Sequence, residues 1–320
     1  MELQILTTKT DPIFDVLDLP FIEANTLPVS LIDMEQNHII PVFTKDNHAL
    51  ISQHQFIHTT HDIITSIHNN DVLGPYIRVS HPIKGRVPSA RHKKAHELLP
   101  HEETIYYERM MFVYIIPSIT KVVNGQELKL VIGGVKAYNK DNLNKNGNAM
   151  QHFTFFIGFQ VKVCSNLCVW SDGLKDSIMV NSLDALGYSI NSLISGYNPA
   201  AQLDFLSRLN QYTLSEREFA HFLGKCRLYN FLPRDRKQAL IPSGLNDTQL
   251  SYVAKQYFQD HHFASTGGYI DLWSLYNLFT AALKTSYIDT IIDNNVLVGN
   301  FFTHMISSLD STKSSWYLLD

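Results

Sequence analysis

Short apolar runs rich in β-branched and aromatic residues, separated by Pro, Gly and Asn, recur through the first half of the chain, which is typical of β-strands. Strands are predicted over the segments 29–32, 39–43, 105–107, 111–116, 128–132, 152–163 and 167–170. Pro117 and the pair Gly133 and Gly134 are expected to end the strands before them, and Asn146 with Gly147 marks a further turn. Short turns between successive strands predict an antiparallel β-meander.

Apolar residues recur at helical spacing in one early segment and in most of the chain after residue 182. Helices are predicted over 48–68, 216–229 and 301–309, with a further helix opening at Asp271. Ser215 with Glu218 forms a capping box at the start of 216–229, and Pro233 ends that helix.

These patterns predict an α+β fold, in which an antiparallel β-meander with packed helices forms the N-terminal half and helices form the C-terminal half. Residues 1–25 mix prolines and acids with little periodicity, so an irregular N-terminal arm is expected there. A β-rich α+β domain is then predicted over 26–180, and a helical domain or subdomain over 181–320.

Composition indicates a globular protein. The chain has 320 residues, of which 45% are hydrophobic and 18% charged, enough to bury a large core. The N-terminal residues carry no basic segment followed by an apolar one, and no apolar run is long enough to span a bilayer, so a soluble cytoplasmic protein is expected. An odd count of three cysteines favours reduced thiols over a disulfide framework.

Charge is unevenly distributed along the chain. Residues 1–75 carry two Lys/Arg against ten Asp/Glu (−8), residues 76–150 carry twelve against six (+6), and residues 151–320 carry twelve against fourteen (−2). The segment 78–94 holds six Lys/Arg and no acid, and four aromatic residues follow between 106 and 114. Cations for phosphates and aromatic rings for bases are what binding of single-stranded nucleic acid requires.

We therefore interpret this region as a nucleic-acid-binding surface. Its candidate residues are Arg78, Lys84, Arg86, Arg91, Lys93, Lys94 and Arg109, with Tyr106 and Tyr107 as stacking platforms. The other interpretation of such a run is a solvated surface loop, and strand alternation would bury about half of the aromatic rings.

Three histidines form the candidate metal site. His54, His58 and His61 lie at i, i+4 and i+7 of the predicted helix, a spacing that can ligate a metal. The favoured interpretation is a solvated polar helix face, so neither a metal nor another cofactor is predicted.

A catalytic site is the least favoured interpretation. Cys164 and Cys168 are expected to be small buried residues, and Glu102 and Glu103 to be structural charges. Catalysis would need a pocket that brings His81, His92 or His96 to Glu102 or Asp172. No complete catalytic constellation is present in the sequence, so no catalytic residue is assigned.

Several segments resemble the family called domain of unknown function 3871. They are IRVSH (77–81), IKGR (83–86), TIYYERM (104–110), IGGVKAYN (132–139), FIGF (156–159), VCSNLCV (163–169) and DLWSLYNLFT (271–280). The resemblance covers residues 20–318. The Cys-Ser-Asn and Trp-x-x-Tyr-Asn-x-x-Thr elements also resemble the phage- and plasmid-like proteins of domain of unknown function 932. In the latter element, Trp273, Tyr276, Asn277 and Thr280 share one helical face, which suits either packing or a ligand.

The resemblance implies an accessory protein of a mobile genetic element and carries over no catalytic residue. Two hypotheses follow. The first is a non-enzymatic protein that binds DNA, preferably single-stranded, for annealing or protection, with a homo-oligomer aligning neighbouring basic surfaces. The second is an anti-defence or regulatory factor that binds a host protein through its acidic residues 1–75.

Overall fold

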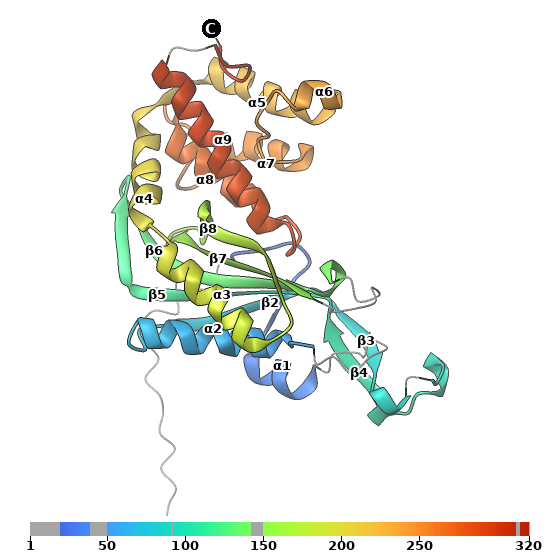
Figure 1. The fold of residues 1–320 in the computed structure, drawn as a ribbon. Helices are drawn as coiled ribbons and strands as arrows, with labels where there is room; N and C mark the ends of the chain where they lie inside the picture. Colours follow the sequence, from blue (N-terminus) through green and yellow to red (C-terminus); the bar gives the residue numbers. More distant parts are fainter. Residues whose placement is uncertain (1–19, 39–49, 91, 142–149, 312–313, 320) are drawn as a thin grey trace, which may run out of the picture.

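The computed structural model describes residues 20–38, 50–90, 92–141, 150–311 and 314–319. A six-stranded antiparallel sheet of order β1-β2-β5-β6-β7-β8 forms the centre of the fold. Helices α2 and α3 lie along one face of this sheet, and the C-terminal helices gather on its other side (Figure 1). The α+β prediction is confirmed, with a β-meander from β5 to β8 and a helical C-terminal half.

The strands of the central sheet are β1 (Leu27–Val29), β2 (Leu73–Val79), β5 (Arg109–Val123), β6 (Gln126–Ala137), β7 (Gln151–Val161) and β8 (Leu167–Val180). Two smaller ladders pair β3 (Pro82–Arg86) with β4 (Glu103–Tyr107), and β9 (Thr213–Ser215) with β10 (Tyr269–Asp271). The helices are α1 (Leu31–Asn37), α2 (Gln53–Ile67), α3 (Leu183–Gly196), α4 (Pro199–Arg208), α5 (Glu216–Phe231), α6 (Arg234–Lys237), α7 (Asp247–Gln259), α8 (Leu272–Leu283) and α9 (Ile291–Ser311). Within the described chain, no helix is both long and apolar enough to cross a membrane.

The glycine pair in β6 lies inside a strand, so the predicted strand end at Gly133 and Gly134 is wrong. Phe56 of α2 packs edge-on against Phe112 of β5, with ring centroids 5.1 Å apart. A Cβ at Gly134 would lie 2.4 Å from the Phe56 ring, and one at Gly133 would lie 2.5 Å from the Phe156 ring. Glycine therefore lets aromatic rings cover both faces of the strand.

Two other predicted strand boundaries also change. The strand predicted over 29–32 ends at Val29, because the Ser30 side chain accepts a hydrogen bond from the Asp33 backbone N–H and caps α1. Pro117 lies within β5, where the register to β6 shifts between Ile116 and Thr120. The predicted strand 39–43 and the turn at 146–147 lie outside the described residues.

The helix predictions hold, with different lengths. The Ser215 capping box is present at the start of α5, and Asp271 caps α8 through the Ser274 N–H. The last helix runs from Ile291, ten residues before its predicted start. Gly299 lies inside this extension. A Cβ there would stand 2.9 Å from the Trp170 ring, so packing favours glycine at this position of the helix.

Candidate nucleic-acid interface

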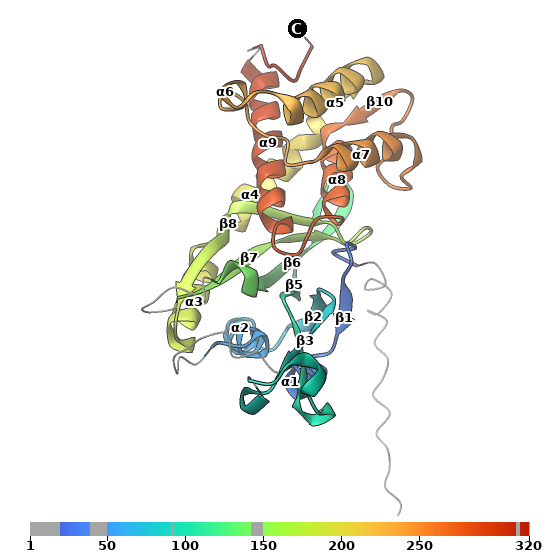
Figure 2. The ribbon, with the colours of Figure 1, turned by 90° about the vertical axis from the view of Figure 1, so that its right-hand side faces the viewer.

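The basic run lies on a hairpin that projects from the central sheet. We call residues 81–108, which contain β3 and β4, the arm. Its two ends are joined where the Ser80 N–H donates to the Arg109 carbonyl at 2.9 Å. Figures 1 and 2 show the arm extending away from the C-terminal helices. Because the arm projects from the sheet, its outer part is accessible to a large partner.

Two lysines of the arm present their charge to solvent. The Lys84 side chain is 78% exposed and forms an ion pair with Glu103 at 3.0 Å, whereas Lys94 is exposed and has no ion pair with a described residue. Exposed ion pairs contribute little free energy, so Glu103 does not prevent Lys84 from engaging a phosphate.

Two other cations hold the tip of the arm together. Arg86 donates to the backbone carbonyl of Lys93, and the Lys93 ammonium donates to Glu102. The backbone N–H of Leu99 and the Lys93 ammonium both donate to the Glu102 carboxylate and lower its pKa. Arg91 lies outside the described residues.

Arg78 and Arg109 lie in the central sheet instead of on the arm. The Arg109 guanidinium stands 3.4 Å from the Asp289 carboxylate and lies over the Tyr287 ring, which ties β5 to the segment before α9. Arg78 donates from Nε to the Thr26 hydroxyl at 3.1 Å and from Nη2 to the Thr26 carbonyl at 3.0 Å.

The two tyrosines differ in accessibility. Tyr107 is 7% exposed, and its ring centroid lies 4.1 Å from that of His38, so it belongs to the core. Burial raises the pKa of both Tyr107 and Tyr106. Tyr106 is half-buried, so of the two rings it is the one with surface available to a base.

The fold brings acids beside the basic run. Sequence positions 78–94 contain no acid, yet the β3–β4 ladder places Glu103 opposite Arg86, and Glu102 bonds to Lys93. Across 81–108 there are five Lys/Arg and four Asp/Glu, a balance of +1. The local field is therefore weaker than the sequence run indicates.

Two of the three histidines of α2 lie near each other, with the ring centroids of His54 and His58 6.5 Å apart, but each of the three has its own further contact. His54 lies 2.9 Å from the Ser52 hydroxyl, His58 contacts the Glu35 carboxylate, and the His61 ring packs against Tyr114. Among the residues with described side chains, no group of three or more His, Cys, Asp or Glu could hold a metal.

The surroundings of Cys164 and Cys168 favour a role in packing over one in catalysis. Both are free thiols; Cys168 is fully buried as expected, whereas Cys164, in the β7–β8 turn, is only partly buried. Burial raises the pKa of Cys164 to about 11 and that of Cys168 further. A thiol with a raised pKa is a poor nucleophile near neutral pH.

The two motif elements that contain Asn166 and Asn277 pack against each other. The Asn166 side chain donates to the Asn277 carbonyl at 2.9 Å, and the Asn277 side chain donates to the Trp273 carbonyl at 3.0 Å. All three residues are buried. This face of α8 therefore packs against the turn between β7 and β8, as expected for a packing surface.

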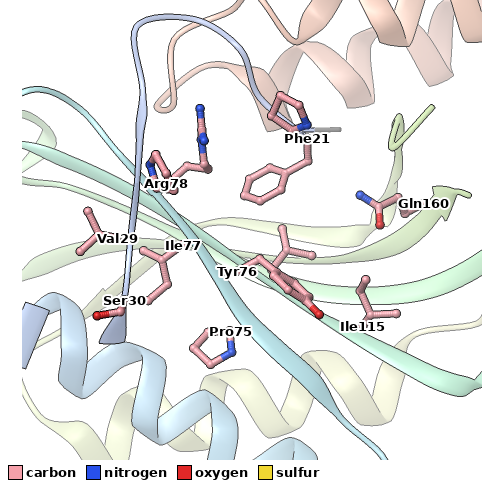
Figure 3. Close-up of a pocket in the computed structure, with 12 residues that line it drawn as sticks. Phe21, Val29, Ser30, Pro75, Tyr76, Ile77, Arg78, Ile115 and Gln160 are labelled. Atoms are coloured by element: carbon pink, nitrogen blue, oxygen red, sulfur yellow. The ribbon is translucent and has the colours of Figure 1, made fainter. Parts of the chain in front are cut away.

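A pocket beside Arg78 is the feature that sequence reasoning missed. It has a volume of about 690 Å³ and lies between β2, β5 and the segment 20–30 (Figure 3). Figure 2 shows this segment running along the sheet from the helical half to α1. Residues from distant parts of the sequence form the walls, so no local pattern could indicate it.

Comparison with known proteins identifies a family. No curated protein and no solved structure matches the chain. The model of the family described as "Domain of unknown function, B. Theta Gene description (DUF3871)" matches residues 4–318, nearly the full length. The chain therefore belongs to the DUF3871 family.

Proposed function

We propose that this protein is a cytoplasmic accessory factor of a mobile element that binds nucleic acid without catalysis, with single-stranded DNA favoured for annealing or protection. The observation that carries the proposal is the projecting arm, whose Lys84 and Lys94 face solvent. The arm also carries the half-buried Tyr106, on whose ring an unstacked base can stack.

The charge of the arm sets the expected salt dependence. Each phosphate neutralised on a single strand contributes about −0.7 to the slope of log affinity against log salt. The two exposed lysines alone therefore predict a slope of about −1.4, and all five cations of the arm predict about −3.5. The measured slope shows how many cations take part.

The test is fluorescence anisotropy with labelled single- and double-stranded DNA at several salt concentrations. The double variant Lys84→Glu/Lys94→Glu is expected to lose at least about tenfold in affinity, because two contacts become repulsions. The matched control is Arg217→Glu/Lys255→Glu, which reverses two exposed charges on α5 and α7. Unchanged affinity in the arm variant, or equal losses in both, would refute the assignment to the arm. Light scattering on the same samples tests the proposed homo-oligomer.

The second candidate is binding of a host protein through the acidic N-terminal region. Ile32 on α1 is 64% exposed and lies beside Asp33 and Glu35, a mixed apolar and acidic surface. This proposal predicts a complex that survives nuclease treatment and is lost in Ile32→Asp. A complex that dissociates with nuclease would instead indicate bridging by nucleic acid.

A further inference from the structure

The pocket beside Arg78 is already formed in the folded chain. The backbone N–H groups of Glu23 and Ala24 donate to the Lys284 carbonyl at 2.8 and 3.2 Å, which fixes the segment that closes one side. The other side is the sheet surface of β2 and β5, held by the ladder between them. A binding site that needs no ordering on ligand entry loses less affinity to conformational entropy.

Apolar side chains form most of the pocket wall. Phe21 comes from the closing segment, Tyr76 from β2 and Ile115 from β5. Figure 3 shows the Phe21 ring above Tyr76, with Arg78 on one side of it and Gln160 on the other. Such walls with a few polar groups are typical of sites for small organic molecules, and the volume lies within their usual range.

Arg78 is a cation without a carboxylate partner among the described residues. Thr26 takes two of the five N–H donors of the guanidinium, which leaves three. Desolvation lowers the pKa of Arg78, so the surrounding protein disfavours its charge. An anion that binds two of the free donors would compensate this cost, and the planar guanidinium suits a bidentate carboxylate.

Gln160 defines the opposite end of the pocket. Its Nε2 donates to the Ser165 carbonyl at 3.3 Å, which orients the side chain and leaves the Oε1 oxygen as an acceptor. Gln160 is 7% exposed, so this amide is held by packing. A ligand donor, either N–H or O–H, would match it.

We propose that this pocket binds a small aromatic carboxylate, with the carboxylate on Arg78, the ring between Phe21 and Tyr76, and an N–H or O–H group toward Gln160. The site is separate from the arm and does not depend on nucleic-acid binding. Charge reversal at Lys84 and Lys94 is therefore expected to leave it intact, so the two proposals fail or succeed independently.

The test is isothermal titration calorimetry of the full chain with indole-3-acetate and with the neutral indole-3-acetamide. Both probes carry a ring and an N–H, so their difference isolates the charge. The carboxylate is expected to bind about tenfold or more tightly than the amide. Equal affinities, or no binding of indole-3-acetate at millimolar concentration, would overturn the proposal without any variant being needed.

Two variants test whether Arg78 causes the tighter binding of the carboxylate probe. Arg78→Leu is expected to remove the difference between the probes, whereas Arg217→Leu, which alters an exposed arginine of α5, is expected to keep it. Retention of the preference in a folded Arg78→Leu protein would place the anion elsewhere and contradict the assignment. Phe21→Ala is expected to lower the affinity for both probes by the same factor, since it removes an apolar wall of the pocket and no charge.

Discussion

The buried ion pair between Lys136 and Asp141 offers a quantitative test of the fold beside the β6–β7 connection. Both side chains are fully inaccessible, and Nζ lies 2.6 Å from the Asp141 carboxylate. Nζ also donates to the His152 carbonyl at 3.2 Å, and the His152 N–H donates to the other Asp141 oxygen at 2.7 Å. The Phe153 ring lies 4.0 Å from the ammonium. The pair therefore links β6 to the start of β7.

Removing one partner should cost more than removing both. Lys136→Met leaves the Asp141 carboxylate buried without its cation, and such losses are about 3–5 kcal/mol. In Lys136→Met/Asp141→Asn, the neutral amide oxygen can still accept the His152 N–H, and methionine fills the space beside Phe153. We expect the double variant to lie within about 2 kcal/mol of the wild type, so the coupling energy is several kcal/mol.

The same pair predicts a pH dependence with a definite sign. Burial lowers the pKa of Lys136 from 10.5 to about 8. Between these values the unfolded chain holds more protons at this residue than the folded chain, so its contribution to stability rises with pH. The penalty on the charged form is fully present below pH 8. Relative to Lys136→Met/Asp141→Asn, which has no titratable group at this pair, the wild type should gain about 2 kcal/mol between pH 7.5 and 9.5.

The assay is urea unfolding followed by far-ultraviolet circular dichroism for the wild type, both single variants and the double variant. Asp141→Asn is the second single variant, which leaves the ammonium buried. A loss below about 1 kcal/mol in Lys136→Met, or purely additive single losses, would refute the buried-pair argument. A difference in stability between the wild type and the double variant that does not change with pH would refute the assigned direction of the pKa of Lys136.

Two further predictions concern packing and the thiols. Gly134→Ala should lower the free energy of unfolding by about 1–3 kcal/mol, because the new Cβ would lie 2.4 Å from the Phe56 ring. The control Gly224→Ala in α5 places its Cβ in open space and should not destabilise the protein. Equal effects of the two variants in denaturant unfolding would contradict this prediction. Cys164, with a pKa raised from 9.0 to about 11, should react with iodoacetamide at pH 8 about 100-fold more slowly in the folded chain than in urea. Rapid labelling of Cys164 in the native protein, read by mass spectrometry, would contradict the raised pKa of this thiol.

Local patterns in the sequence were sufficient to predict the strands that consist of one apolar run and the helices that begin at a clear capping residue. The apolar runs within β5 and β7 and the caps at Ser215 and Asp271 all lead to the observed structure. Prediction failed where a residue serves a tertiary contact. In the sequence Gly134 is typical of a turn, but it lies within strand β6. Glycine fits there because the Phe56 ring of α2 fills the space that a side chain would take.

The candidate site was less accessible to sequence reasoning, because charge balance and exposure depend on pairing between distant residues. The run before residue 94 contains no acid, and only the β3–β4 ladder shows that Glu102 and Glu103 lie beside it. Strand alternation predicts that about half of the four aromatic rings between 106 and 114 are buried, whereas Tyr107, Phe112 and Tyr114 are all buried. The sequence also could not show that Arg78 lies in β2 and donates to Thr26, a residue distant in the sequence.

The motif elements around Asn166 and Asn277 lie apart from the candidate binding surfaces, whereas the segments 77–81 and 83–86 contribute Arg78 and Lys84 to those surfaces, and this difference bears on how function should be sought. Asn166 and Asn277 join the β7–β8 turn to α8 in the interior, where side chains meet no solvent. The exposed lysines of the arm and the walls of the Arg78 pocket lie outside that contact. Substitution of the buried asparagines would destabilise the fold, so a loss of activity in such variants would not locate a binding surface. Variants at Lys84, Lys94 and Arg78 change charge at the surfaces themselves, so they distinguish the proposed partners while the core stays intact.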